Sequence, residues 1–166
     1  LCRFGYIDFI NDLEVSKALL DAVAAWGREH GMDSLAGPLG MTDLDYEGAL
    51  TEGFDQLSTM STIYNYPYYV DHFAAYGMEV DAQWNEYVIP IPDQLTDKHE
   101  QVAAFVRSRY GLRSFSETSR TRLREKWGHK IFELLNEAYS PLYCVSELDD
   151  NQIQYYIDLY LPLLRL

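Results

Sequence analysis

The chain has 166 residues, of which 48% are hydrophobic and 23% are charged. This length supports one good hydrophobic core or two small ones, and the composition excludes a largely disordered chain. The formal net charge of −13 disfavours binding to nucleic acid and to anionic membranes, because both require an excess of Lys and Arg.

Neither a membrane-spanning apolar run nor a signal peptide is visible, so we expect a cytoplasmic protein. The two cysteines, Cys2 and Cys144, lie far apart in the sequence, and we expect them to be buried free thiols. The chain begins with Leu1 in place of Met and ends in an apolar run, which predicts that the natural protein extends beyond both ends.

The first part of the chain reads as a strand followed by a helix. Loosely alternating apolar residues over 4–10 predict a buried strand. Asn11, with Glu14 three residues later, has the spacing of a capping box at the start of a helix. Apolar residues then recur at helical spacing over 15–26, which predicts a helix that ends at Gly31.

Four further elements are expected before the middle of the chain. A short strand over 34–39 is followed by a long polar loop over 40–63, of a length that is often functional. Pro67 can begin a helix that runs to Tyr76, since proline suits the first position of a helix. A pair of strands is expected over 78–91.

The rest of the chain is predicted to be mainly helical, with two short strands. The expected helices and strands are helix 97–111, strand 112–115, helix 120–139, strand 142–145 and a last helix that begins at Asp149 or Asp150. A boundary falls near the prolines at 90 and 92, so the sequence predicts one part over 1–92 and another over 93–166.

The order strand, helix, strand, helix, strand, strand over 4–91 resembles the second half of the GCN5-related N-acetyltransferase fold. Tyr76-Gly77-Met78-Glu79 resembles a looser form of the Tyr-x-x-x-Gly-Phe-Glu ending of that family. The stretches GPLGMTDLDYEG and IYNYPYY also look like a group of uncharacterised proteins that carry two such folds in tandem.

The resemblance implies an α/β (α+β) fold with a mixed central sheet and flanking helices. Residues 1–92 would be the C-terminal half of one acetyltransferase-like domain, and residues 93–166 would be a helical segment and the start of a second copy.

The resemblance also implies a site for acetyl-CoA or another acyl-CoA. In the family, a turn between strand and helix binds the pyrophosphate, and a tyrosine protonates the departing thiolate. Tyr76 is the candidate for that tyrosine, and His72 can share its helix face and move protons. The cofactor would lie against five residues: Phe9, Ile10, Asn11, Ser16 and Asn65.

The family's glycine-rich signature is absent from the turn over 11–16, which instead carries Asp12 and Glu14. Both acids would repel a phosphate. Two functions therefore stay open: transfer of an acyl group from acyl-CoA to a small-molecule amine, or a catalytically degenerate domain that acts as a ligand-binding or structural interaction module.

Two other features concern ligands and partners. Tyr64, Tyr66, Tyr68 and Tyr69 crowd one short segment, and they predict either the wall of a ligand cleft or a homodimer surface. The loop over 42–48 resembles a calcium loop, but a phenylalanine stands at its closing position and no Cys/His cluster is present, so no metal site is expected.

Overall fold

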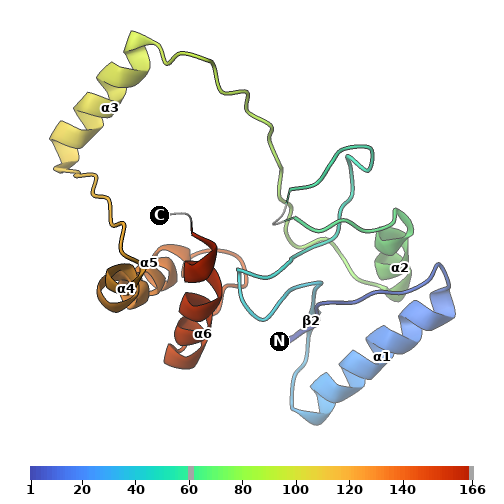
Figure 1. The fold of residues 1–166 in the computed structure, drawn as a ribbon. Coiled ribbons are helices and arrows are strands. Elements are labelled where there is room, and N and C mark those ends of the chain that lie inside the picture. Colours follow the sequence, from blue (N-terminus) through green and yellow to red (C-terminus); the bar gives the residue numbers. More distant parts are fainter. Residues whose placement is uncertain (60–61, 165–166) are drawn as a thin grey trace. The chain divides into compact units, whose positions relative to one another are not determined.

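The computed structural model describes residues 1–59 and 62–164 (Figure 1). The chain divides into two compact units. The first unit comprises Leu1–Ala82 and Asn136–Leu148, and the second comprises Gln83–Leu135 and Asp149–Leu166. This division does not test the predicted boundary at residue 92, which stays a prediction.

The predicted mixed central sheet is wrong, because the described residues are mostly helical and their sheet has two strands. Strand β1 (Cys2–Arg3) pairs in parallel with β2 (Leu35–Ala36), with Cys2 opposite Leu35. The predicted strand over 4–10 is wrong: the Phe4 amide still donates to the Ala36 carbonyl at 3.1 Å, but residues 4–10 form no strand, and Phe9 is buried in a core that is built mainly with helices. The carbonyl of Phe9, for example, accepts from the Tyr68 hydroxyl at 2.7 Å.

The expected strands over 78–91, 112–115 and 142–145 are also wrong, since none of these described residues belongs to a strand. Their apolar patterns resemble strands, but a strand needs a hydrogen-bonded neighbour. Val88 and Ile89, for example, are 96% and 79% exposed instead of packed in a sheet.

The helix predicted after the first strand is confirmed as α1 (Leu13–Glu29). Its N-cap is Asp12 and not Asn11, because the Asp12 carboxylate accepts from the Glu14 amide at 2.9 Å. The helix ends at His30, and Gly31 follows with a φ of 74°.

The predicted helix after Pro67 is confirmed as α2 (Tyr68–Tyr76), which ends at Gly77 in the left-handed region with a φ of 95°. Helix α2 packs against α1, as Figure 1 shows for the blue and green helices. A cluster of buried side chains joins the two helices to the N-terminal segment: Phe4, Phe9, Leu20, Tyr69 and Phe73. This packing positions the candidate site.

Residues 140–148, at the C-terminal end of the first unit, form an irregular segment that is tied to the rest of that unit by polar contacts. Tyr143 donates to the Asp81 carboxylate at 2.6 Å, and Arg3 donates to the Ser146 hydroxyl at 3.2 Å. Cys144 in this segment is half-buried and Cys2 is buried; both are free thiols, as expected, although Cys144 is less buried than predicted.

The helices predicted over residues 93–166 are confirmed. They are α3 (Asp97–Tyr110), a continuous helical stretch of α4 (Arg120–Arg122), π-helix η1 (Leu123–Gly128) and α5 (His129–Tyr139), and then α6 (Asp150–Tyr160) with the short η2 (Leu161–Leu163). Asp149 caps α6 through the Gln152 amide at 2.9 Å. A Cβ on Gly128 would lie 3.1 Å from Ile157, so the small residue permits η1 and α6 to pack closely.

No helix among the described residues is both long enough and apolar enough to cross a membrane. The cytoplasmic location stays a prediction.

Candidate functional site

The buried side chain of His72 links α2 to the N-terminal turn of α1. His72 is 4% exposed, and its Nδ1 lies 2.8 Å from the Ser16 Oγ. Its Nε2 lies 2.9 Å from the Asn11 Oδ1, which can only accept, so Nε2 donates. In a neutral ring, Nδ1 is an acceptor, and it competes with the Leu13 carbonyl for the single hydrogen of the Ser16 hydroxyl. Both ring nitrogens are therefore satisfied by protein groups.

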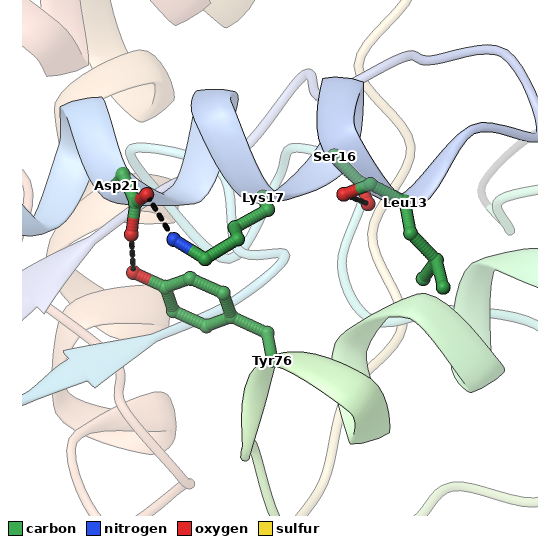
Figure 2. Close-up of polar contacts among 5 residues, drawn as sticks. All are labelled: Leu13, Ser16, Lys17, Asp21 and Tyr76. Carbon is green, nitrogen blue, oxygen red and sulfur yellow. Dashed lines mark hydrogen bonds and ion pairs between the residues drawn. The ribbon is translucent and has the colours of Figure 1, made fainter.

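Ser16 is as deeply buried as its histidine partner, with 2% of its surface exposed. Its hydroxyl also lies 3.2 Å from the Leu13 carbonyl, a contact drawn in Figure 2. The Asn11–Ser16–His72 set, which we call the His72 network, has the groups of a proton relay. Its polar atoms are nevertheless used to join two helices inside the unit.

Phe9 forms one wall of the His72 network and is itself in the core. Its ring stacks on His72 at a centroid distance of 5.3 Å and on Tyr69 at 4.2 Å. Only 6% of Phe9 is exposed. Its aromatic ring therefore contributes to packing and offers little surface to a cofactor.

Tyr69 lies on the other side of Phe9 and joins α2 to the N-terminal segment. Its hydroxyl donates to the Asp8 carboxylate and accepts from the Phe9 amide at 3.3 Å. Burial, followed by the hydrogen bond to Asp8, raises the pKa of Tyr69 to about 12. The phenol is consequently neutral throughout the physiological range.

Tyr76 belongs to a separate, exposed cluster, which Figure 2 shows between α1 and α2. Its hydroxyl donates to the Asp21 Oδ1 at 3.0 Å, and the Asp21 Oδ2 lies 2.6 Å from the Lys17 Nζ. Desolvation, followed by the hydrogen bond to Asp21, raises the pKa of Tyr76. The hydrogen bond from Lys17 lowers the pKa of Asp21, and the same bond raises the pKa of Lys17.

Tyr76 has the protonated hydroxyl of a general acid, but this hydroxyl does not face an open site. The Tyr76 hydroxyl is protonated at neutral pH, as an acid requires, and its raised pKa makes it a weaker proton donor than an ordinary tyrosine. The proton, however, is directed at Asp21 and not at an open site. Lys17 and Asp21 are exposed, so water screens the ion pair and it adds little stability.

Two of the predicted cofactor residues lie apart from the His72 network. Ile10 is 67% exposed. Asn65 is buried, and its side chain accepts from the Leu50 amide at 2.6 Å and donates to the Leu50 and Tyr66 carbonyls. The structure thus brings together Phe9, Asn11, Ser16 and His72. Ile10 lies between Phe9 and Asn11 in the chain but exposes its side chain, whereas Tyr76 and Asn65 bond to other groups of the same unit.

A small pocket opens beside Asn65, with a volume of about 70 Å³. It is lined by Tyr6, Ile7, Pro38, Tyr46, Gly48, Ala49, Ile63, Asn65 and Tyr69. The polar ends of Asn65 and Tyr69 are held by their own hydrogen bonds, so most of the lining is apolar. Neither His72 nor Tyr76 lines this pocket.

Sequence reasoning missed this pocket, although a signal for it was present. The two stretches that carry the family resemblance, residues 37–48 and 63–69, supply six of its nine lining residues. Their closeness in space depends on the fold, since the loop between them gives no local sign of it. Residues 60 and 61 of that loop lie outside the described residues.

The tyrosine-rich segment divides between core and surface. Tyr69 is buried, whereas Tyr64 and Tyr66 are 53% and 64% exposed. Tyr66 stacks on Tyr68 at a centroid distance of 5.5 Å. The segment therefore supplies one pocket wall, and the homodimer surface stays a prediction.

The N-terminal turn of α1 carries acidic groups where a phosphate would bind. The Asp12 carboxylate already accepts the Glu14 amide, and it places negative charge at the positive end of the helix dipole. Among the residues the structure describes, no group of three or more His, Cys, Asp or Glu side chains could hold a metal ion.

The comparisons with known proteins identify one partial likeness. No family model matches the chain, and no solved structure matches it. Over 75 residues the chain is 34% identical to Protein YghO of Escherichia coli (strain K12). The match covers 45% of this chain and 19% of that protein. The chain thus spans about a fifth of YghO, and the likeness shows no family for the chain.

Proposed function

We propose that the first unit is a ligand-binding module that takes a short acyl or alkyl group in the pocket beside Asn65. The observation that carries this proposal is the apolar lining, in which the polar ends of Asn65 and Tyr69 are already bonded. A pocket of about 70 Å³ suits a group of a few non-hydrogen atoms. Acetyl-CoA or another acyl-CoA is the first candidate ligand, with its acyl end in the pocket.

The position of the candidate catalytic groups favours binding over catalysis. A general acid or base must come within hydrogen-bond reach of the reacting group. His72 and Tyr76 do not line the pocket, and each is bonded to other side chains. This arrangement supports the ligand-binding or interaction module among the two functions expected from the sequence.

Calorimetric titration of the full chain with acetyl-CoA, and with CoA lacking the acyl group, tests the proposal. We expect acetyl-CoA to bind more tightly than CoA and to raise the melting temperature. Ala49→Leu would fill the pocket and abolish this difference, whereas Ala104→Leu on exposed α3 would retain it. The proposal fails if millimolar acetyl-CoA gives neither heat nor a thermal shift, or if Ala49→Leu binds normally.

A second candidate is acyl transfer to an amine, which the His72 network favours because it joins an imidazole, a hydroxyl and an amide within hydrogen-bond distance. The amine nitrogen would attack the thioester carbonyl, so that a C–N bond forms and the C–S bond breaks. A base such as His72 would take the amine proton, and Tyr76 would protonate the departing thiolate.

His72→Gln distinguishes this second candidate from a structural role. If His72 handles the proton, amine-dependent thiol release from acetyl-CoA should fall at least about 100-fold. We expect instead no turnover in either protein and a loss of about 2–3 kcal/mol in the free energy of unfolding, because Ser16 and Asn11 lose a buried partner. His129→Gln on exposed α5 is the matched control and should change stability little.

A further inference from the structure

The charge of the chain is distributed very unevenly. Residues 107–130 contain eight of the 13 Lys and Arg residues but only two of the 26 acids, Glu117 and Glu125. This stretch therefore carries a net charge of +6, and the rest of the chain carries −19. A cationic segment is thus present in a protein whose total charge is strongly negative.

An exposed aromatic pair lies within this stretch. The rings of Phe115 and Trp127 stack at a centroid distance of 4.5 Å and an angle of 27°. The Lys126 and Lys130 ammonium groups lie 5.1 and 5.6 Å from the Trp127 ring centroid. Phe115 is 64% exposed, so much of its ring stays open to solvent although it contacts Trp127.

Several cations around this pair have no acidic partner in the part of the chain that the structure describes. Arg124 is paired with Asp158, and Arg120 donates to the Leu164 carbonyl at 3.0 Å. The structure records no ion pair for Arg122, Lys126 and Lys130, which recur every four residues along the helical stretch. Arg113, two residues before Phe115, is likewise exposed and has no recorded ion pair.

We propose that this cationic face, formed by Arg113, Phe115, Arg122, Lys126, Trp127 and Lys130, binds single-stranded nucleic acid. Phosphates would contact the four cations, and a base would stack on the open side of the Phe115 ring. Proteins that bind single strands without sequence preference combine cations along the nucleic-acid backbone with aromatic rings on which the bases stack.

The proposal departs from the expectation drawn from the total charge. Screening limits exposed charges to a range of about 8–10 Å at ordinary ionic strength, so the charge near a ligand decides its binding. Glu125 and Glu133 are the exposed acids nearest in sequence to Lys126 and Lys130, and four cations outnumber them on this face. The proposal is independent of the ligand pocket in the first unit.

Fluorescence anisotropy of a labelled 20-nucleotide oligo-dT, titrated with the full chain, tests the proposal. We expect binding at low salt that weakens as salt rises, with a log–log slope of about −3 for four phosphate contacts. Phe115→Ala should weaken binding at least about fivefold, because one base loses its platform. Lys126→Gln should weaken binding and make the salt slope less steep by about 0.7.

Two variants on α3 serve as matched controls. Phe105 is 64% exposed, the same as Phe115, and Lys98 is an exposed lysine outside the cationic face. Phe105→Ala and Lys98→Gln should bind the oligonucleotide as the wild type does. Circular dichroism is the measurement that checks whether each variant retains its helices.

Three results would overturn the proposal. One is an anisotropy that does not rise at protein concentrations up to about 100 μM, the weak limit of ordinary non-specific binding. The second is binding to phosphatidylserine vesicles but not to the oligonucleotide. The third is salt-sensitive self-association that Lys126→Gln abolishes while oligonucleotide binding is absent, which would assign the face to the acidic surface of a second copy.

Discussion

At the scale of single residues, Tyr69 combines burial, hydrogen bonding and a raised pKa in one side chain. It is 6% exposed, it donates to Asp8, and it stacks on Phe9. A phenolate at this position would be desolvated and would face the Asp8 carboxylate without a proton between them. The neutral phenol is therefore part of the folded state, and its loss should destabilise the protein.

We predict that Tyr69→Phe lowers the free energy of unfolding by about 1–3 kcal/mol at pH 7. The folded-state pKa of Tyr69 is about 12 and its ordinary value is 10.0. The stabilisation from the neutral phenol is therefore fully present below pH 10 and is lost as the pH rises towards 12. The difference between the wild type and Tyr69→Phe should accordingly shrink over pH 10–12 in urea unfolding experiments.

Tyr87→Phe is the control for this prediction, since Tyr87 is 76% exposed. This substitution should have almost no effect on the free energy of unfolding, at pH 7 or over pH 10–12. A constant difference between the wild type and Tyr69→Phe from pH 7 to pH 12 would contradict the assignment of the raised pKa.

At the scale of elements, the N-terminus of α1 shows why this helix begins where it does. Asp12 supplies the capping acceptor, and the next residue, Leu13, is the first helical residue. The neighbouring Asn11 turns its side-chain oxygen to His72 on α2 and so is not available as a cap. Asp12 thus caps the start of α1, and Asn11 joins α1 to α2.

We predict that Asp12→Ala destabilises the first unit by about 1 kcal/mol, because an unpaired amide is left at the helix terminus. Asp12→Asn should retain most of the stability, since asparagine is an equally good N-cap. Urea unfolding followed by circular dichroism measures both. Equal losses in the two variants would show that charge, and not the hydrogen bond to Glu14, is the source of the stabilisation.

At the scale of the whole molecule, residues 83–95 form a long connection between α2 and α3. This connection is exposed and lacks regular structure. Tyr87 and Ile91 in this connection are 76% and 86% exposed. Its backbone makes no strand ladder among the described residues, so local opening of this segment costs little.

We predict that chymotrypsin under native conditions cuts this connection first, at Tyr87. The helices α1 and α2 should resist, because their backbone is hydrogen-bonded and their aromatic side chains pack in a common core. Mass spectrometry of the first products measures the site. Initial cleavage within α1 or α2 would contradict this ranking of local stability.

The sequence alone determined the positions of the helices. The residues at the ends of a helix act on the backbone of the adjacent turn, as Asp149 does at the start of α6 and Gly77 at the end of α2. They therefore indicate helix ends before any fold is known. Strands depend on neighbours that are distant in sequence, and the apolar runs over 4–10 and 78–91 resemble strands without obtaining such neighbours.

Only the tertiary structure decided what the candidate site residues do. The resemblance named Asn11 and Ser16, and the helical spacing to Tyr76 named His72, but their hydrogen bonds arise only when α1 packs on α2. It also named Asn65, whose place beside the pocket depends on a long loop folding back. Local patterns encode backbone conformation, whereas burial and hydrogen-bond partners are properties of residues brought together from distant parts of the chain.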